Sequence, residues 1–360
     1  MTTVINGNLT VNGTVSSYLD TSLDSLPENG ISYISLPATN IYGWYGGVLA
    51  PNGKIYCCPY DSDSVLIIDP VTNTANTTTI SGLGSGSGKW NGGVLASNGK
   101  IYCVPRNATS VLIIDPVTNT ADTTTISGLS GAANKWQSVA LAPNGKIFGI
   151  PRDATYVLII DPVTNTVDTT SITGLSGIRK WTGAAVAPNG KIYCSPYDNA
   201  TILEIDPVTY ATTYIQIPYY GNGIRWSAAV LAPNGKIYFV PYSLVIPVVL
   251  VFDPLTQTTN AIPYLDYQPN SLWGGVLAPN GKIYCMQYGS TNKILIINPE
   301  TDTLDVTSLR GLIPSAYNGG VLAPNGKIYG VPVATSNILV INTGLPKLPP
   351  WMLNPLFNKI

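Results

Sequence analysis

The chain of 360 residues contains no histidine, only three methionines and four phenylalanines, and just 10% of its residues are charged. Without histidine it lacks the side chain that most often serves as a general base or metal ligand near neutral pH. A net charge of −1 argues against the electrostatic attraction on which non-specific nucleic-acid binding depends. No apolar run approaches the roughly 20 residues of a membrane-spanning helix, and the polar first residues do not resemble a cleaved signal peptide. We therefore expect neither nucleic-acid binding nor a membrane span.

Recognised catalytic and cofactor motifs are absent as well. The sequence contains no P-loop, nucleophile elbow, zinc-binding H-E-x-x-H or EF-hand loop. Asp61 and Asp63 form a single D-x-D pair, and Asp153 and Asp198 stand alone, so no spacing predicts paired catalytic carboxylates. These absences predict a protein that is not an enzyme and that binds no metal and no cofactor.

Five cysteines raise the question of a disulfide. Cys57, Cys103, Cys194 and Cys285 each follow the tripeptide Lys-Ile-Tyr in different repeats. Equivalent positions in a ring of repeats lie farther apart than the roughly 5.5 Å between the Cα atoms of a disulfide, and Cys57 and Cys58 point to opposite faces of one strand. We therefore expect free cysteines that act as small buried hydrophobic residues, as in a reducing cytosol.

What the sequence does contain is a repeat with a period near 45 residues. The element Ala-Pro-Asn-Gly-Lys-Ile-Tyr occurs seven times, with Ser97 in place of proline in the second copy and Phe148 in place of tyrosine in the third. Its glycines are Gly53, Gly99, Gly145, Gly190, Gly235, Gly281 and Gly326. Abundant β-branched residues and turn formers, without helical periodicity, indicate an all-β protein. Because propeller blades repeat at this length, the sequence predicts a single seven-bladed β-propeller.

Each period divides into four predicted strands, which in the second copy are residues 92–96, 100–105, 111–115 and 120–126. A two-residue turn with positive φ at both positions is predicted at Asn98-Gly99, and Asp-Pro-Val-Thr-Asn-Thr predicts another turn between the last two strands. The seventh copy lacks a fourth strand, whereas residues 30–36 precede the first copy. These residues are predicted to complete the last blade and close the ring.

The repeats resemble seven-bladed propellers of the YVTN and NHL-like classes. That resemblance covers residues 30–343 and implies the fold, because propellers carry enzymes, lectins and scaffolds alike. The predicted organisation is an N-terminal segment of residues 1–28, a propeller of residues 29–343 and an apolar, proline-rich tail of residues 344–360. We expect the tail to fold back across the propeller or to dock on a neighbouring subunit.

The alternating polar residues near the N-terminus resemble the N-terminal segments of phage and viral fibre or appendage proteins. The resemblance implies that residues 1–28 attach the propeller to an assembly. Ile5, Leu9 and Val11 would lie on short strands that add to a partner's exposed sheet edge.

Two sets of residues are candidates for a binding surface. Loops that vary among the repeats share one face of the predicted disc, here called the variable face, and the near-invariant turns share the opposite, constant face. The variable-face candidates are Asp61, Asp63, Arg106, Arg152, Arg179, Lys180 and Arg225. Their basic members form either an electropositive sector for an anionic glycan or ordinary solvated charge.

The second set consists of six tryptophans that precede the innermost strands: Trp44, Trp90, Trp136, Trp181, Trp226 and Trp273. They form an aromatic platform for sugars or, as their regularity favours, a packing ring between blades.

Together these features favour a non-enzymatic module for assembly or recognition. We expect it to belong to a virion or another extracellular appendage, after folding in the cytosol, as a homo-oligomer or together with other structural proteins. The alternatives are a secreted propeller that binds a surface glycan and an intracellular scaffold for protein interactions.

Overall fold

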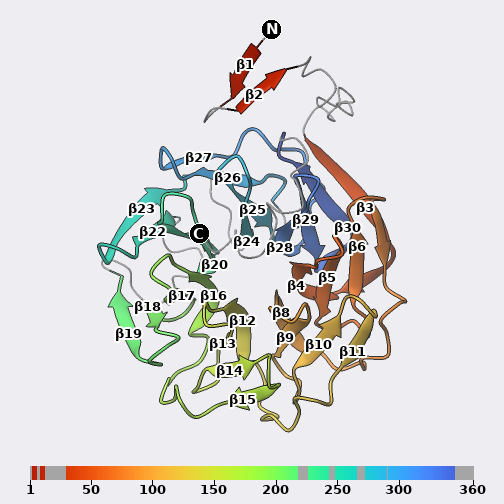
Figure 1. The fold of residues 1–360 in the computed structure, drawn as a ribbon, viewed down its shortest axis with the longest axis vertical. Helices are drawn as coiled ribbons and strands as arrows, with labels where there is room; N and C mark the ends of the chain where they lie inside the picture. Colours follow the sequence, from red (N-terminus) through yellow and green to blue (C-terminus); the bar gives the residue numbers. More distant parts are fainter. Residues whose placement is uncertain are drawn as a thin grey trace.

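Seven four-stranded antiparallel sheets surround a central axis (Figure 1). The computed structural model describes residues 2–5, 9–12, 30–217, 226–242, 248–265, 272–289 and 291–344. In six blades the strands follow one another in chain order from the axis outward, and the seventh has the order β28-β29-β30-β3. This arrangement confirms the predicted seven-bladed, all-β propeller. In the described part of the chain no helix is long and apolar enough to cross a membrane.

The innermost strands are β4 (Trp44–Leu49), β8 (Trp90–Leu95), β12 (Trp136–Leu141), β16 (Trp181–Val186), β20 (Trp226–Leu231), β24 (Leu272–Leu277) and β28 (Tyr317–Leu322). The second strands are β5 (Ile55–Pro59), β9 (Ile101–Pro105), β13 (Ile147–Pro151), β17 (Ile192–Pro196), β21 (Ile237–Pro241), β25 (Ile283–Gln287) and β29 (Lys327–Pro332).

The third strands are β6 (Leu66–Asp69), β10 (Leu112–Asp115), β14 (Leu158–Asp161), β18 (Thr201–Ile205), β22 (Val248–Asp253), β26 (Leu295–Asn298) and β30 (Ala334–Asn342). The outer strands are β7 (Thr74–Asn76), β11 (Thr120–Asp122), β15 (Thr166–Asp168), β19 (Thr212–Gln216), β23 (Thr258–Pro263), β27 (Thr303–Asp305) and β3 (Ile31–Ile41).

The hydrophobic core lies between neighbouring blades. The second strands are buried at every residue except Lys327 of β29, because both of their faces meet another sheet. Between the first two blades, for example, Tyr56 and Ile67 pack with Ile101 and Leu112.

Two local features differ from the sequence prediction. The turn after β8 has three residues, because Ala96 N donates to Lys100 O (2.9 Å), and within the turn only Gly99 has a positive φ, of 78°. The outer strand β11 ends at Asp122, earlier than predicted. The Asp122 carboxylate accepts hydrogen bonds from the backbone amides of Thr124 (2.7 Å) and Thr125 (3.1 Å), which turns the chain out of the sheet.

A repeated hydrogen bond on the constant face links one blade to the next. The Tyr56 hydroxyl donates to Asn119 Oδ1 (2.7 Å), which belongs to the Asp-Pro-Val-Thr-Asn turn of the second blade. Tyr102 makes the same bond to Asn165 of the third blade (2.8 Å). Asn119 and Asn165 have positive φ values of 53° and 55°, a conformation that asparagine tolerates better than most residues. We call this the Tyr–Asn contact.

The N-terminal strand closes the ring as predicted. β3 pairs antiparallel with β30, with Ile31 opposite Ile341 and Ser35 opposite Asn337. Tyr329 of the last blade also donates to Asn73 Oδ1 of the first (3.0 Å), so the Tyr–Asn contact spans the closure.

The two segments outside the ring are described only in part. β1 (Thr2–Ile5) and β2 (Leu9–Asn12) form an antiparallel hairpin in which Ile5 lies opposite Leu9. The attachment role predicted for Ile5, Leu9 and Val11 stays a prediction. The fate predicted for the apolar tail concerns residues 345–360, which lie outside the described residues.

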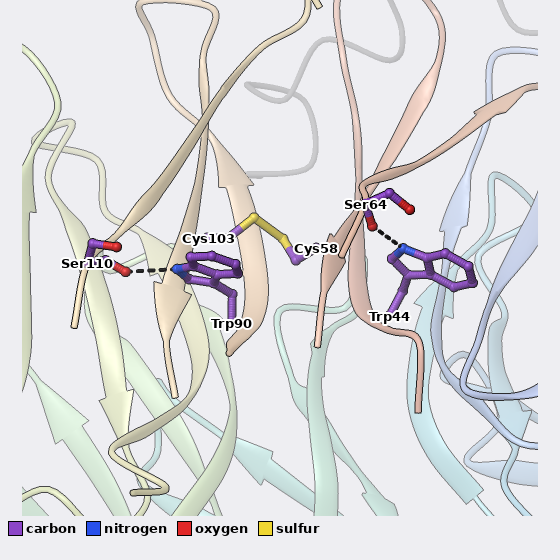
Figure 2. Close-up of a disulfide and its surroundings, with 6 residues drawn as sticks. All are labelled: Trp44, Cys58, Ser64, Trp90, Cys103 and Ser110. Carbon is purple, nitrogen blue, oxygen red and sulfur yellow. Dashed lines mark hydrogen bonds between the residues drawn. A yellow bond between two sulfur atoms is a disulfide. The ribbon is translucent and has the colours of Figure 1, made fainter. Parts of the chain in front are cut away.

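The expectation that all cysteines are free is wrong. Figure 2 shows a disulfide between Cys58 of β5 and Cys103 of β9, whose Cα atoms are 6.2 Å apart. The argument from equivalent positions overlooked this pair because Cys58 lies one residue after the repeated position. Cys58 therefore faces the second blade, where Cys103 occupies the repeated position. Cys57, Cys194 and Cys285 are free and buried, and burial raises their thiol pKa.

Truncation tests the closure. Removing residues 1–28 should leave the free energy of unfolding unchanged, because β3 begins at Ile31. Removing residues 1–36 should cost more than about 3 kcal/mol, since it breaks a backbone hydrogen-bond network in the last blade. Chemical denaturation of both variants provides the measurement, and equal stability of the two would contradict the assigned pairing.

The disulfide predicts a stability difference that depends on redox conditions. It closes a sequence separation of 45 residues, so the double variant Cys58→Ser/Cys103→Ser should lose about 4 kcal/mol relative to the oxidised protein. Dithiothreitol should destabilise the natural chain but not this variant. Cys194→Ser is the matched control, because it changes a buried free thiol. Peptide mapping without reduction that finds five alkylatable thiols would rule out the bridge.

Candidate functional site

Five of the predicted tryptophans are core residues. Trp44, Trp90, Trp136, Trp181 and Trp226 are at most 3% exposed. Each indole nitrogen donates to a backbone carbonyl of the same blade, as in the bonds from Trp44 to Ser64 (2.7 Å) and from Trp90 to Ser110 (2.8 Å) seen in Figure 2. These five side chains wedge between blades and offer no platform to a ligand.

Trp273 does not belong to this ring. Leu272 holds the equivalent position, since it pairs with Gln287 as Trp44 pairs with Pro59. Trp273 precedes Gly281 by eight residues, whereas Trp44 precedes Gly53 by nine. This shift of one residue was visible in the sequence, and it leaves the indole half-buried among tyrosines of other loops.

A ring of seven residues surrounds the axis on the variable face. Each member follows a second strand directly, and that strand ends opposite the start of the innermost strand. We call these residues the axial ring: Tyr60, Arg106, Arg152, Tyr197, Tyr242, Tyr288 and Val333. Sequence reasoning found the two arginines but not the tyrosines, although all seven stand directly after the end of a second strand.

The tyrosines of the axial ring form one aromatic cluster with Tyr45 and Trp273. Tyr45 stacks on Tyr60 with ring centroids 4.0 Å apart, and its hydroxyl lies 3.5 Å from that of Tyr288. Trp273 lies 4.9 Å from Tyr242 and 5.5 Å from Tyr288. Burial and the nearby Tyr288 raise the pKa of Tyr45, so its hydroxyl stays protonated.

Three arginines border the aromatic cluster. The guanidinium of Arg106 lies 5.2 Å from the centre of the Tyr60 ring and donates through Nε to Asn134 Oδ1 (2.8 Å). Within the described residues no carboxylate forms an ion pair with Arg106. Arg152 pairs with Asp153, at 3.0 Å. Burial lowers the pKa of Arg152, Asp153 raises it, and the nearby Arg106 and Arg179 lower it further, so the three cations share one electrostatic environment.

Arg179 adopts a strained backbone conformation at this border. Its φ is 51°, and the equivalent residues of the two preceding blades are Gly88 and Asn134, which suit a positive φ. Its guanidinium lies 5.3 Å from the centre of the Tyr197 ring and pairs with Asp198 (3.0 Å).

Lys180 is buried rather than exposed on the variable face. It is 2% exposed, and its Nζ donates to the carbonyls of Arg152 (3.1 Å), Ala154 (2.8 Å) and Gly177 (2.8 Å). Lys135 is bound in the same way in the preceding repeat. Burial lowers the pKa of both lysines to about 8. These ammonium groups tie loops of adjacent blades together and do not form a solvent-facing sector.

The remaining candidates are dispersed. Asp61 accepts hydrogen bonds from Ser87 Oγ (2.8 Å) and Gly88 N (2.7 Å), so it holds the connection to the next blade. Asp63 is exposed, and Arg225 lies outside the described residues. Across the described ranges, no three acidic, cysteine or histidine side chains gather closely enough to hold a metal ion.

Comparison with known proteins places the chain by fold alone. No family model matches the sequence, and no curated protein matches it. Among solved structures, the chain is similar to a streptogramin B lyase, with a TM-score of 0.70 and 13% identity over 87% of this chain and 97% of that one. It is also similar to YCF48 bound to D1 peptide, with a TM-score of 0.67 and 10% identity over 88% and 98% of the two chains.

The expectation that the protein is not an enzyme is contradicted by this comparison. Virginiamycin B lyase from Staphylococcus aureus, an enzyme, shares the fold with a TM-score of 0.70 and 12% identity over 87% of this chain and 98% of that one. A variant of that lyase with alanine in place of a histidine is catalytically inactive, whereas the present chain has no histidine. The propeller fold alone does not decide whether this chain is an enzyme.

The buried lysines make a testable prediction. Lys180→Met should destabilise the fold by about 1–3 kcal/mol, because it leaves buried carbonyl oxygens without a donor. Lys100→Met is the control, since the Lys100 side chain is 45% exposed and pairs with Asp115 on the constant face. Urea unfolding of the two variants gives the comparison, and equal midpoints would show that Lys180 has no structural role.

Proposed function

We propose that the protein is a recognition module that binds an acidic carbohydrate at the aromatic cluster of the variable face. The observation that carries the proposal is that an aromatic cluster and two arginines lie side by side around the axis. The cluster residues are Tyr45, Tyr60, Tyr242, Trp273 and Tyr288, and the arginines are Arg106 and Arg152. These side chains come from different blades, and their contacts with one another hold them in place without a ligand.

The chemistry of the cluster suits a sugar that carries a carboxylate. Aromatic side chains supply flat apolar surface together with hydroxyl and indole polar groups. A guanidinium has five N–H donors and binds a carboxylate through two parallel hydrogen bonds. Arg106 uses Nε and Nη2 on Asn134, so its other nitrogen, Nη1, has no partner within the described residues. Stacking on Tyr60 orients the group before a ligand arrives.

The backbone of Arg179 supports the same conclusion. A residue other than glycine at positive φ costs free energy that the surrounding structure must offset. Glycine and asparagine occupy this position in the second and third blades, whereas Tyr42 in the first and Arg179 in the fourth adopt the same positive φ with large side chains. The Arg179 side chain contacts Tyr197 of the axial ring.

A matched set of oligosaccharides tests the proposal. Binding of uronic-acid oligosaccharides should be measured by calorimetry beside the same oligosaccharides after reduction of the carboxyl group. We expect Trp273→Ala and Arg106→Gln each to weaken binding of the acidic form about 10-fold, equivalent to about 1.4 kcal/mol. Arg106→Gln should leave binding of the neutral form unchanged, because no carboxylate is then present.

Lys100→Gln, on the constant face, is the control and should bind as the natural chain does. The proposal would be rejected if the uronic-acid oligosaccharides did not bind at all, or if they bound Trp273→Ala as tightly as the natural chain.

Display of this face on a virion or appendage is a further prediction, and it assigns attachment to residues 1–28. Because β3 begins after this segment, its deletion leaves the aromatic cluster complete. The truncated protein should therefore bind the same oligosaccharides but no longer enter its native assembly.

A further inference from the structure

In the first three blades, the residue after the axial-ring position holds the connection that leads into the next blade. Its side-chain oxygen accepts a hydrogen bond from a backbone amide of that connection, in the pairs Asp61–Gly88 (2.7 Å), Asn107–Asn134 (2.8 Å) and Asp153–Arg179 (2.7 Å). An amide oxygen and a carboxylate oxygen both accept such a bond. The contact therefore needs an oxygen atom but not a charge.

The arginines that border the aromatic cluster differ in the charge of their partners. Two of them form ion pairs, Arg152 with Asp153 (3.0 Å) and Arg179 with Asp198 (3.0 Å). Arg106 instead donates through Nε (2.8 Å) and Nη2 to Oδ1 of Asn134, which is neutral. The Asn134 amide thus fixes the guanidinium of Arg106, also stacked on Tyr60, without offsetting its charge.

A second amide stands beside Arg106 where other blades have a carboxylate. Asn107 follows Arg106 directly, and the equivalent residues of the first, third and fourth blades are Asp61, Asp153 and Asp198. Asn107 also donates through Nδ2 to Ser87 O (2.9 Å), a bond that an aspartate could not make. Asp61, the acid of the preceding blade, is itself bound to Ser87 Oγ and Gly88 N.

We infer that Asn107 and Asn134 set the preference of the proposed carbohydrate site for an acidic ligand, because they hold Arg106 in position without neutralising it. This inference rests on the function proposed above. Arg106 is partly exposed, so a ligand can reach it. A ligand carboxylate would bind there rather than at Arg152, where the carboxylate of Asp153 would repel it. Asn107 and Asn134 are therefore positioning residues, and Arg106 makes the contact with the ligand.

Asn134→Asp tests the neutral partner of Arg106. Aspartate keeps the acceptor oxygen and tolerates a positive φ, so the guanidinium should stay in place while its charge is offset. Calorimetry should show about 3- to 10-fold weaker binding of the uronic-acid oligosaccharides and unchanged binding of their carboxyl-reduced forms. Asn298→Asp is the matched control, because it adds the same charge on the constant face, where the first five blades have aspartate at this position.

Two further variants exchange the residues of the second and third blades. Asn107→Asp should weaken binding of the acidic form in the same way, because it gives the second blade the carboxylate of its neighbours. Asp153→Asn should instead strengthen it about 3-fold, because it removes the ion pair of Arg152 and leaves an amide oxygen for Arg179 N. A gain of affinity cannot result from a variant that folds poorly.

Equal weakening of the acidic and reduced forms by Asn134→Asp would overturn the inference, since it would show a structural role alone. An unchanged ratio of acidic to reduced binding in these three variants would overturn it too. In both cases the natural chain still binds the uronic-acid oligosaccharides, so the proposed function stands. If the natural chain does not bind them, the proposed function is rejected and this inference with it.

Discussion

A hydrogen bond from the tyrosine of one blade to the Asp-Pro turn of the next recurs around the ring, with asparagine as the acceptor at three interfaces and Asp302 as the acceptor for Tyr238. It joins the two most regular elements of the repeat, because the tyrosine ends the Ala-Pro-Asn-Gly-Lys-Ile-Tyr motif and the asparagine belongs to the Asp-Pro-Val-Thr-Asn turn. The third repeat departs from this pattern. Phe148 lacks the hydroxyl there, and the partner position holds Tyr210, whose own hydroxyl accepts a hydrogen bond from Lys146 (2.7 Å). The lost donor is thus compensated within the same contact.

This contact fixes one face of the disc and leaves the other free to differ. On the constant face each turn must fit its neighbour, so its residues change little from blade to blade. At the opposite ends of the same strands, the side chains of the residues that follow the second strands make no such repeated contact. Tyrosine, arginine and valine therefore all occur in the axial ring. A regular scaffold with one unconstrained face is how propellers combine a common fold with different binding sites.

The periodic part of the structure could be predicted from the sequence, and the departures from the period could not. Seven glycines at constant spacing predicted seven blades, and the unpaired residues 30–36 predicted the closing strand. Reasoning from equivalent positions missed Cys58, because its partner Cys103 is not its equivalent. It also assigned Lys180 to the surface, since composition does not reveal three backbone carbonyls that converge on one ammonium group. Trp273 was wrongly assigned to the tryptophan ring, because it stands one residue closer to the repeated glycine than the other tryptophans do.

The irregular start of the innermost strands places an aromatic side chain beside an obligatory glycine. In the first blade the register shifts between Trp44 and Gly47, which carries Tyr45 to the aromatic cluster and brings Gly46 against the backbone of Gly92. A side chain at Gly46 would collide with that backbone, so the same local distortion places an aromatic ring on the variable face and requires glycine directly beneath it.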